Sequence, residues 1–193
     1  MTVIVGDDGL ARCPWATTHP LNTAYHDGEW GRPVHGEQAL YERICLEAFQ
    51  AGLSWLTILA KRTAFRAAFA GFDPQVVAGF GNRDVERLLA DTGIVRNRAK
   101  IQAAITNAGA TLALREHGGL DRLIWSHRST TTLRPRTAAE VPASTPASKA
   151  LAGVLRTRGF VFVGPTTVHA LMEAVGLVDT HLVGCHRRGP AGR

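Results

Sequence analysis

The chain has 193 residues and a net charge of +6, which suits one domain or two closely packed lobes and favours a polyanionic partner such as nucleic acid, although a generically basic protein has the same balance. Its three unevenly spaced cysteines argue against a secreted disulfide scaffold, and residues 1–10 lack the basic and apolar regions of a signal peptide. The longest uncharged apolar stretch, residues 48–60, is too short to span a bilayer as a helix, so we expect a cytoplasmic protein without a membrane segment.

Helical patterns dominate the chain in sequence order. Apolar periodicity, with Ser54 and Asn82 as caps and several glycines as stops, predicts helices over residues 37–49, 54–72, 82–93, 97–119, 119–127, 148–160 and 165–176. The "FVFVG" run at residues 160–164 is more typical of an extended connector than of a sheet strand. The sequence therefore predicts an all-α fold.

The sequence also indicates how the chain is divided into a folded unit, an internal connection and flexible ends. Residues 128–147 form a connection rich in Pro, Ser and Thr. We expect residues 10–187 to form a single unit, with flexible ends at residues 1–9 and 188–193. No internal repeat is present.

Cysteine and histidine lie near both ends of the chain. His181 and Cys185 are four residues apart, so a helix or turn would place them on one face. Zinc sites need about four thiolate or imidazole ligands, and Cys13 with His26 could complete a set that joins the two ends. The spacing is not that of a zinc finger, and two partly buried thiols with two surface histidines fit it as well. Cys45 fits a small core residue.

Four aromatic side chains and one carboxylate stand out in the first third of the chain. The aromatic residues are Trp15, Tyr25, Trp30 and Trp55, which ordinary core packing would also explain. Glu47, however, lies in the mostly apolar "ICLEAFQAGLSW", where a carboxylate is costly without a partner. A carboxylate among aromatic rings suits a flat ligand that forms hydrogen bonds and carries positive charge, such as a nucleobase.

Two turns suit contacts with DNA. In "QAGLSW", Gly52 and Leu53 lie at a helix junction where an apolar tip could protrude. In "DTGIVRNRAKI", Gly93 permits a tight turn before a helix whose first N–H groups are free to bind an anion. Three cations follow this glycine closely: Arg96, Arg98 and Lys100. The pattern predicts a clamp on the DNA backbone without base specificity, while a solvated basic helix start is the simpler alternative.

These motifs, in this order, resemble the DNA-3-methyladenine glycosylase I family of the helix-hairpin-helix glycosylase superfamily. The resemblance runs from about Arg12 to Cys185, and its carriers are "RCPW", "AYHDGEWG", "ICLEAFQAGLSW", "DTGIVRNRAKI", "STPAS", "RGFVFVGPTT" and "HLVGC". It implies two helical lobes, one central with a hairpin at about residues 82–115, and one built from the N- and C-terminal segments.

The resemblance also implies an activity. Members excise N3-methyladenine from alkylated double-stranded DNA as monofunctional glycosylases at the start of base excision repair, releasing the free base. It implies structural Zn²⁺ on Cys13, His26, His181 and Cys185. It further implies that Glu47 recognises the base in a pocket of Tyr25, Trp55, Trp15 and Trp30, that Gly52 and Leu53 enter the DNA, and that the segment from Gly93 to Lys100 binds its backbone. A monomer is expected.

One position departs from the family pattern. The family has "VND" before the zinc histidine, whereas this chain has "VDTH", which places Asp179 where other superfamily members carry a catalytic aspartate. Asp179 could therefore stabilise a cationic sugar or orient water, or it could act only as a hydrogen-bonding cap. Two other functions remain open: a non-catalytic helical DNA-binding module, and a glycosylase for another lesion. The iron–sulfur members need four clustered cysteines, which this chain lacks.

Overall fold

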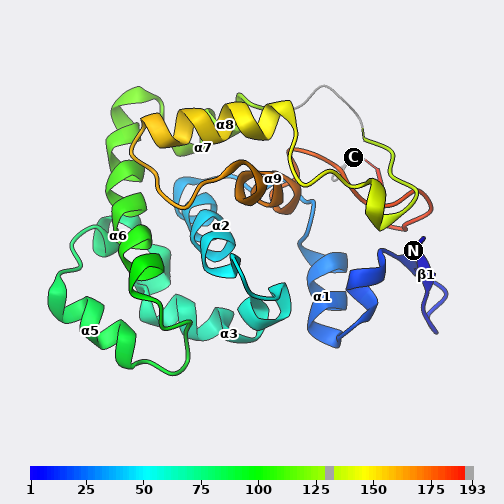
Figure 1. Ribbon diagram of the computed structural model, residues 1–193, viewed down its shortest axis with the longest axis horizontal. Coiled ribbons are helices and arrows are strands. Elements are labelled where there is room, and N and C mark those ends of the chain that lie inside the picture. Colours follow the sequence, from blue (N-terminus) through cyan, green and yellow to red (C-terminus); the bar gives the residue numbers. More distant parts are fainter. Residues whose placement is uncertain (129–132, 190–193) are drawn as a thin grey trace.

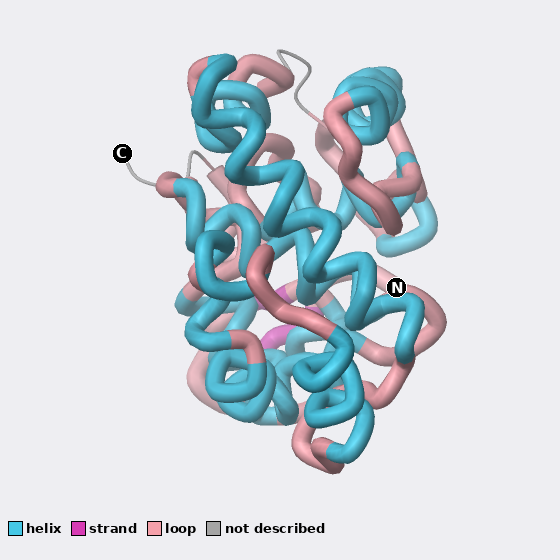
Figure 2. Tube along the Cα trace, turned by 90° about the vertical axis from the view of Figure 1, so that its left-hand side faces the viewer, coloured by secondary structure: helices cyan, strands magenta, loops and turns pink. Residues whose placement is uncertain are grey.

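The computed structural model describes residues 1–128 and 133–189, and its regular structure is mostly helical, as the sequence predicts (Figures 1 and 2). Two short antiparallel strands pair Ile4 with Arg12 and Val5 with Ala11. The strands are β1 (Ile4–Val5) and β2 (Ala11–Arg12). The α-helices are α1 (Pro20–Gly28), α2 (Glu37–Gln50), α3 (Trp55–Ala68), α4 (Pro74–Val77), α5 (Asn82–Ala90), α6 (Arg98–Ala113), α7 (Gly119–Trp125), α8 (Pro146–Thr157) and α9 (Pro165–Ala174). Short 3₁₀ turns are η1 (Pro14–Thr17), η2 (Ala70–Phe72), η3 (Leu114–His117) and η4 (Ala138–Glu140).

Helix boundaries follow local capping chemistry. Ser54 caps α3 as predicted, because its hydroxyl accepts the Thr57 N–H. Asn82 was the wrong cap for α5: Gly81 holds that position, and the Asp84 carboxylate accepts the Gly81 N–H. The helix predicted over residues 97–119 ends earlier, at Ala113, and continues only as the 3₁₀ turn η3. The "FVFVG" run forms no strand.

Some elements were not predicted. Helix α1 begins at Pro20 after His19, whose ring accepts the Leu21 N–H, and a histidine is not one of the Ser, Thr, Asp or Asn caps that mark a helix start in a sequence. Strand β1 falls within residues 1–9, which we expected to be flexible. Residues 190–193 of the C-terminal end that we expected to be flexible lie outside the described part of the chain. Residues 129–132 of the predicted connection after α7 lie outside it as well.

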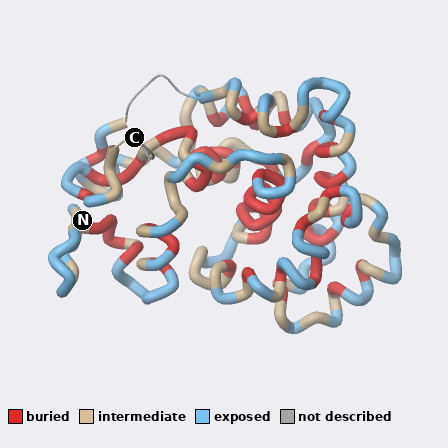
Figure 3. Tube along the Cα trace, turned by 180° about the vertical axis from the view of Figure 1, so that it is seen from behind, coloured by how far each residue is buried: buried red, intermediate tan, exposed pale blue. Residues whose placement is uncertain are grey.

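Helix α2 lies at the centre of the main hydrophobic core (Figure 3). It packs against α3, α6, α7 and α9, so most of its side chains are buried whichever way they point. Leu40, Tyr41 and Phe49 have no exposed surface, and the Tyr41 hydroxyl donates to the Ala104 carbonyl oxygen of α6 at 2.8 Å. A helix fixed on all sides is a rigid support for any functional group it carries.

A second, smaller cluster joins the two ends of the chain. Cys13, Leu182 and Cys185 form its buried centre, and Trp15 and Trp30 pack against it. Figure 1 shows the two chain ends together beside α1, away from α5 and α6. Backbone hydrogen bonds support this closure, including one of 2.8 Å from the N–H of residue 186 to the carbonyl of residue 11. Among the described helices, none combines the length and apolar character needed to cross a membrane.

Candidate functional site

A cavity of about 830 Å³ lies where α1, α2, α3 and α9 meet the chain ends. The five side chains that the sequence placed in a base pocket all line it: Trp15, Tyr25, Trp30, Glu47 and Trp55. They come from η1, α1, the turn after α1, α2 and α3, so only the tertiary fold brings them together. A cavity of this size accommodates a purine ring with room for water or an attached sugar.

The aromatic side chains form a continuous wall. The Trp15 and Trp30 rings meet edge to face with centroids 5.1 Å apart, and the Tyr25 and Trp55 rings are tilted at the same 5.1 Å separation. Trp15 links the two pairs through a 6.4 Å contact with Tyr25. The Trp55 Nε1 atom is buried and has no hydrogen-bond partner among the described residues. It is therefore a free donor beside the cavity.

Glu47 supplies a buried carboxylate to this wall. Its residue is only 5% exposed, and no described side chain donates a hydrogen bond to its carboxylate. The pKa of Glu47 is raised from 4.5 to about 8, mainly by burial and also by the negative charge of Glu173, while Arg43 opposes both effects. Without a cationic partner, the ionised form is costly. A bound cationic ligand would supply the positive charge that stabilises the ionised Glu47 carboxylate.

A network of ion pairs supports the back of the Tyr25 ring. The Arg43 guanidinium lies over that ring, 5.8 Å from its centroid, and donates to Glu29 at 2.8 Å. Arg62 donates to the same Glu29 carboxylate at 2.7 Å and to Glu42 at 2.9 Å. Sequence reasoning missed this network because its members are spread over α2, α3 and the end of α1. The Tyr25 ring is thus fixed in place, with its hydroxyl lacking a recorded partner among the described residues.

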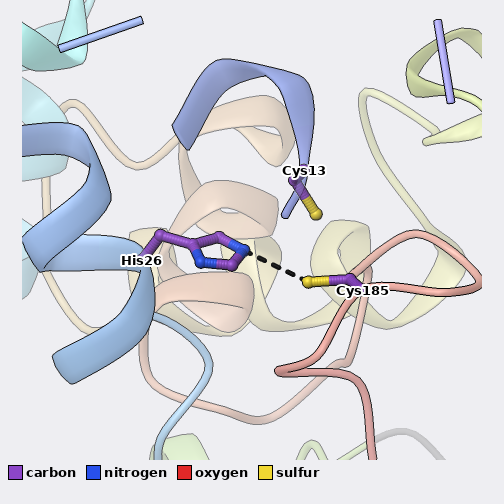
Figure 4. Close-up of side chains that lie close together, drawn as sticks. All are labelled: Cys13, His26 and Cys185. Carbon is purple, nitrogen blue, oxygen red and sulfur yellow. Dashed lines mark hydrogen bonds between the residues drawn. The ribbon is translucent and has the colours of Figure 1, made fainter. Parts of the chain in front are cut away.

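Three of the four predicted metal ligands converge (Figure 4). The ligand atoms of Cys13, His26 and Cys185 lie within 4.8 Å of one another, and His26 Nε2 is 3.4 Å from Cys185 Sγ. The hydrogen bond shared with Cys13 lowers the pKa of the Cys185 thiol far below its usual value, and His26 lowers it further. Cys185 therefore has thiolate character, the form that binds metals.

His181 lies next to these three residues but outside the 4.8 Å group. Its ring centroid is 5.2 Å from that of His26, and its buried Nε2 has no partner among the described residues. Gly31 permits this packing, because a Cβ there would lie 2.7 Å from His181 Cε1. The Asp179 carboxylate contacts His181 Nδ1 at 2.8 Å and accepts its backbone N–H. Asp179 does not line the cavity, and its contact with His181 fits the hydrogen-bonding role that the sequence left open.

The predicted basic turn follows α5 and precedes α6. Gly93 is required there by close approach, since a Cβ would lie 2.9 Å from the Ala64 Cβ of α3. The Asn97 side chain caps α6 by accepting the Lys100 N–H. Arg96 is exposed, and Arg98 is exposed but paired with Glu86 at 2.8 Å. Both guanidinium groups remain at the surface, where an anion can reach them.

Lys100 is placed differently from the prediction. It is only 7% exposed, and its Nζ donates to the Phe49 carbonyl at 2.9 Å and the Ala51 carbonyl at 2.5 Å. It therefore anchors the end of α2 and the following turn instead of offering its charge to a phosphate. The same turn carries Leu53, which is 40% exposed.

Comparison with known proteins agrees with this geometry. The methyladenine glycosylase family profile matches residues 15–188. DNA-3-methyladenine glycosylase 1 of Escherichia coli (strain K12) is 48% identical over 180 residues, covering 91% of this chain and 96% of the relative. A crystal structure of 3-methyladenine DNA glycosylase I superposes with a TM-score of 0.88 at 47% identity, covering 92% of this chain and all of the other.

This chain belongs to the methyladenine glycosylase family. A structure of the Staphylococcus aureus 3-methyladenine DNA glycosylase I, which concerns its recognition of 3-methyladenine, has 34% identity and a TM-score of 0.86. It covers 92% of this chain and 96% of the other. The similarity therefore extends over nearly the whole length of both proteins.

This methyladenine glycosylase also has polar cavity residues that the sequence did not reveal. Glu173 of α9 and Thr180 line the cavity and share a hydrogen bond of 2.5 Å. Asn22 lines it from α1, with its Oδ1 buried and lacking a recorded partner among the described residues. Glu173 lies in the apolar "ALMEAVGL", the same signal that identified Glu47, so that pattern could have found it.

The buried ammonium of Lys100 gives a stability prediction. Lys100→Met keeps most of the side-chain volume but removes the donor from two carbonyl oxygens, of which that of Phe49 is buried. We expect the free energy of unfolding to fall by about 1–3 kcal/mol, measured by chemical denaturation. Lys149→Met, at an exposed position of α8, is the matched control and should leave it nearly unchanged. Equal stabilities for the two variants would contradict the anchoring role.

Glu47 gives a second prediction, on the pH dependence of stability. In the unfolded chain Glu47 ionises near 4.5, whereas in the folded protein it ionises near 8, so its ionisation lowers stability progressively between these pH values. Glu47→Gln removes that loss. The variant should match the wild type near pH 5 and become more stable by about 1–3 kcal/mol at pH 8, as measured by denaturation at each pH. A variant whose stability advantage over the wild type does not increase between pH 5 and pH 8 would refute this.

Proposed function

We propose that this chain is a monofunctional DNA glycosylase that hydrolytically excises N3-methyladenine from alkylated double-stranded DNA, the first step of base excision repair. The observation that carries the proposal is the buried Glu47 carboxylate, which faces an aromatic cavity without a protein cation beside it. The family and the named activity of the Escherichia coli and Staphylococcus aureus relatives support this substrate.

The chemistry suits such a cavity. Methylation at N3 gives adenine in DNA a formal positive charge, which weakens the glycosidic bond and makes the base a good leaving group. The enzyme must therefore extrude the nucleotide, at a cost of a few kcal/mol, and hold the base in place. Stacking on Trp55 and its neighbours would contribute about 1–3 kcal/mol per base.

Each group in the cavity has a defined task in this proposal. The Glu47 carboxylate accepts hydrogen bonds from the amino edge of the base and favours its positive charge electrostatically. Trp55 Nε1, which has no partner among the described residues, and the Tyr25 hydroxyl, whose residue lines the cavity, can donate to the base. Water then attacks the sugar carbon as the bond to the base breaks. None of the described lining residues is a lysine, so a Schiff-base lyase step is not expected.

We assign DNA binding to the surface beside the cavity. Gly52 and Leu53 would enter the space left by the extruded nucleotide. The α5–α6 segment, about residues 82–115, would act as the helix-hairpin-helix element, with backbone N–H groups after Gly93 and the Arg96 and Arg98 side chains contacting phosphates. Residues 10–187 would form the whole catalytic unit, acting as a monomer.

We also propose a structural Zn²⁺ ion on Cys13, His26, His181 and Cys185. The donor set fits tetrahedral zinc, and the buried, unpartnered Nε2 of His181 is the kind of atom that a metal satisfies. Carboxylates hold both histidines by their other nitrogen: Asp27 contacts His26 Nδ1 at 2.7 Å, and Asp179 contacts His181 Nδ1. With four protein ligands, zinc would supply no catalytic water and would pin the chain ends that form part of the cavity wall.

The excision proposal is tested by release of free 3-methyladenine from methylated duplex DNA under single-turnover conditions. The wild type should release it, and Glu47→Gln should slow the reaction by roughly a hundredfold, because a neutral amide does not stabilise the cationic base. Glu116→Gln, which neutralises an exposed carboxylate of η3, is the matched control and should retain the wild-type rate.

Two outcomes would decide against the excision proposal. A wild type that binds the duplex but releases no base at any salt concentration tested would favour a non-catalytic DNA-binding module. A wild type that releases a different methylated base instead would favour a glycosylase for another lesion.

The metal proposal is tested by elemental analysis of purified protein. We expect about one equivalent of zinc in the wild type and loss of most of it in His181→Ala and in Cys185→Ala. His186→Ala is the informative control, because His186 lies close to His26 yet contacts Asp27 instead of the thiols. If His181→Ala retains zinc and His186→Ala loses it, the fourth ligand is His186 and the proposed role of His181 is wrong.

A further inference from the structure

The cavity holds a second acidic side chain, Glu173, opposite the helix that carries Glu47. Glu173 lies in the last turn of α9 and lines the cavity together with Ala170, one turn earlier on the same face. Its side chain is 16% exposed. The opposite face of α9, including Leu171 and Met172, packs into the main core, so α9 cannot turn the carboxylate away.

The protein offers this carboxylate little compensation. The Thr180 hydroxyl donates to Glu173 Oε1 at 2.5 Å. The nearest described basic group is His169 Nε2 at 3.9 Å, and burial lowers the pKa of His169, which keeps that ring neutral at physiological pH. Both ring nitrogens of His169 are buried without partners among the described residues. No Lys or Arg of the described chain forms an ion pair with Glu173.

The position of Glu173 adds to the cost of its charge. It is buried, and it lies at the C-terminal end of a helix, where the backbone dipole disfavours a negative group. A glutamine would keep the hydrogen bond from Thr180 and the same volume without that cost. The negative charge therefore has no structural purpose that the described residues reveal, and costly buried charges of this kind gather at functional sites.

The surroundings of the two acids are otherwise almost free of cations. The charged and titratable groups packed around them are Arg43 on α2, Tyr25 on α1 and His169 on α9. Arg43 donates to Glu29 through Nη2 and lies over the Tyr25 ring, and its buried Nη1 has no hydrogen-bond partner among the described residues, so no hydrogen bond joins it to either acid. Burial raises the pKa of Glu173 to about 7, and the charge of Glu173 helps to raise that of Glu47. The charge of Glu173 thus makes Glu47 harder to ionise until a positive charge enters the cavity.

We propose that Glu173 is a second recognition carboxylate, which acts with Glu47 to select a positively charged, alkylated purine over neutral purines. The inference rests on the proposed function, since it names a further specificity residue of the same cavity. Glu47 alone would favour a cation, but two acids facing one cavity increase the penalty for leaving it filled by an uncharged base. Unmodified adenine, with the same shape and aromatic surface, is the neutral competitor that such a device rejects.

The test compares two small ligands of matched shape as inhibitors of excision. The first is 3,9-dimethyladeninium, a permanent cation, and the second is 9-methyladenine, which is neutral. In Glu173→Gln we expect inhibition by the cation to weaken roughly tenfold or more, while inhibition by the neutral ligand changes less than about twofold. Glu116→Gln should change neither value. Equal weakening for both ligands, or no change for either, would overturn the proposal.

A second measurement does not depend on the Glu173 variant folding. In the Glu47→Gln protein, Glu173 is the remaining cavity carboxylate that ionises near neutral pH, so the preference for the cation over the neutral ligand should still increase between pH 6 and 8. A preference independent of pH in that protein would assign the whole effect to Glu47 and refute the role of Glu173. Binding is followed by tryptophan fluorescence, because Trp15, Trp30 and Trp55 line the cavity.

Failure of this inference is distinguishable from failure of the proposed function. If the wild type releases no 3-methyladenine from methylated DNA, the proposed function fails. If the wild type releases it but Glu173→Gln discriminates between the two ligands as the wild type does, only the role of Glu173 fails.

Discussion

A carboxylate held in an apolar cavity without a protein cation is the constraint on which the rest of this structure depends. Left free to move, the Glu47 side chain would turn towards water or towards the nearby Arg43. It does neither, because α2 is enclosed by other helices and Arg43 is already bound to Glu29. The rigidity of the core thus maintains an unfavourable electrostatic arrangement, which a proton or a cationic ligand relieves. The buried Glu47 carboxylate lowers the stability of the folded protein, and the same carboxylate favours a positively charged ligand.

The cavity wall is built from parts of the chain that are most distant in sequence. Trp15 and Trp30 come from the N-terminal segment, and Thr180 and Leu182 from the C-terminal one. Chain ends usually fray, so a wall made from them needs a fixed closure. The buried Cys13, Leu182 and Cys185 cluster provides it by packing, and the carboxylates of Asp27 and Asp179 hold the neighbouring histidines in place. The geometry of the cavity is therefore tied to the order of both termini.

The sequence predicted best where a pattern is local. Helical periodicity placed most helices within a few residues, and the apolar context of Glu47 identified a carboxylate that is indeed buried in an aromatic cavity. Helix α1 was missed because its cap is a histidine, and Asn82 was wrongly predicted as a cap because a glycine holds that position. The placement of Lys100 could not be predicted, since the carbonyl groups it binds lie about fifty residues earlier in the chain. The contact between Asp179 and His181, although local, needed the turn geometry.

Lys100 and Lys61 also bear on how the surface charge can act. Lys100, which follows the α5–α6 turn, binds carbonyls at the end of α2, while Lys61 of α3, which follows the α2–α3 turn, binds the Thr92 and Gly93 carbonyls in return. These hydrogen bonds connect the two turns. Both lysines contribute to the net charge of +6, but their ammonium groups are already bound to carbonyl oxygens. Binding of a polyelectrolyte weakens with added salt in proportion to the phosphates that the protein neutralises. Its salt dependence here should therefore reflect the few free guanidinium groups near the turns, such as Arg96, and should be shallower than the abundance of basic residues suggests.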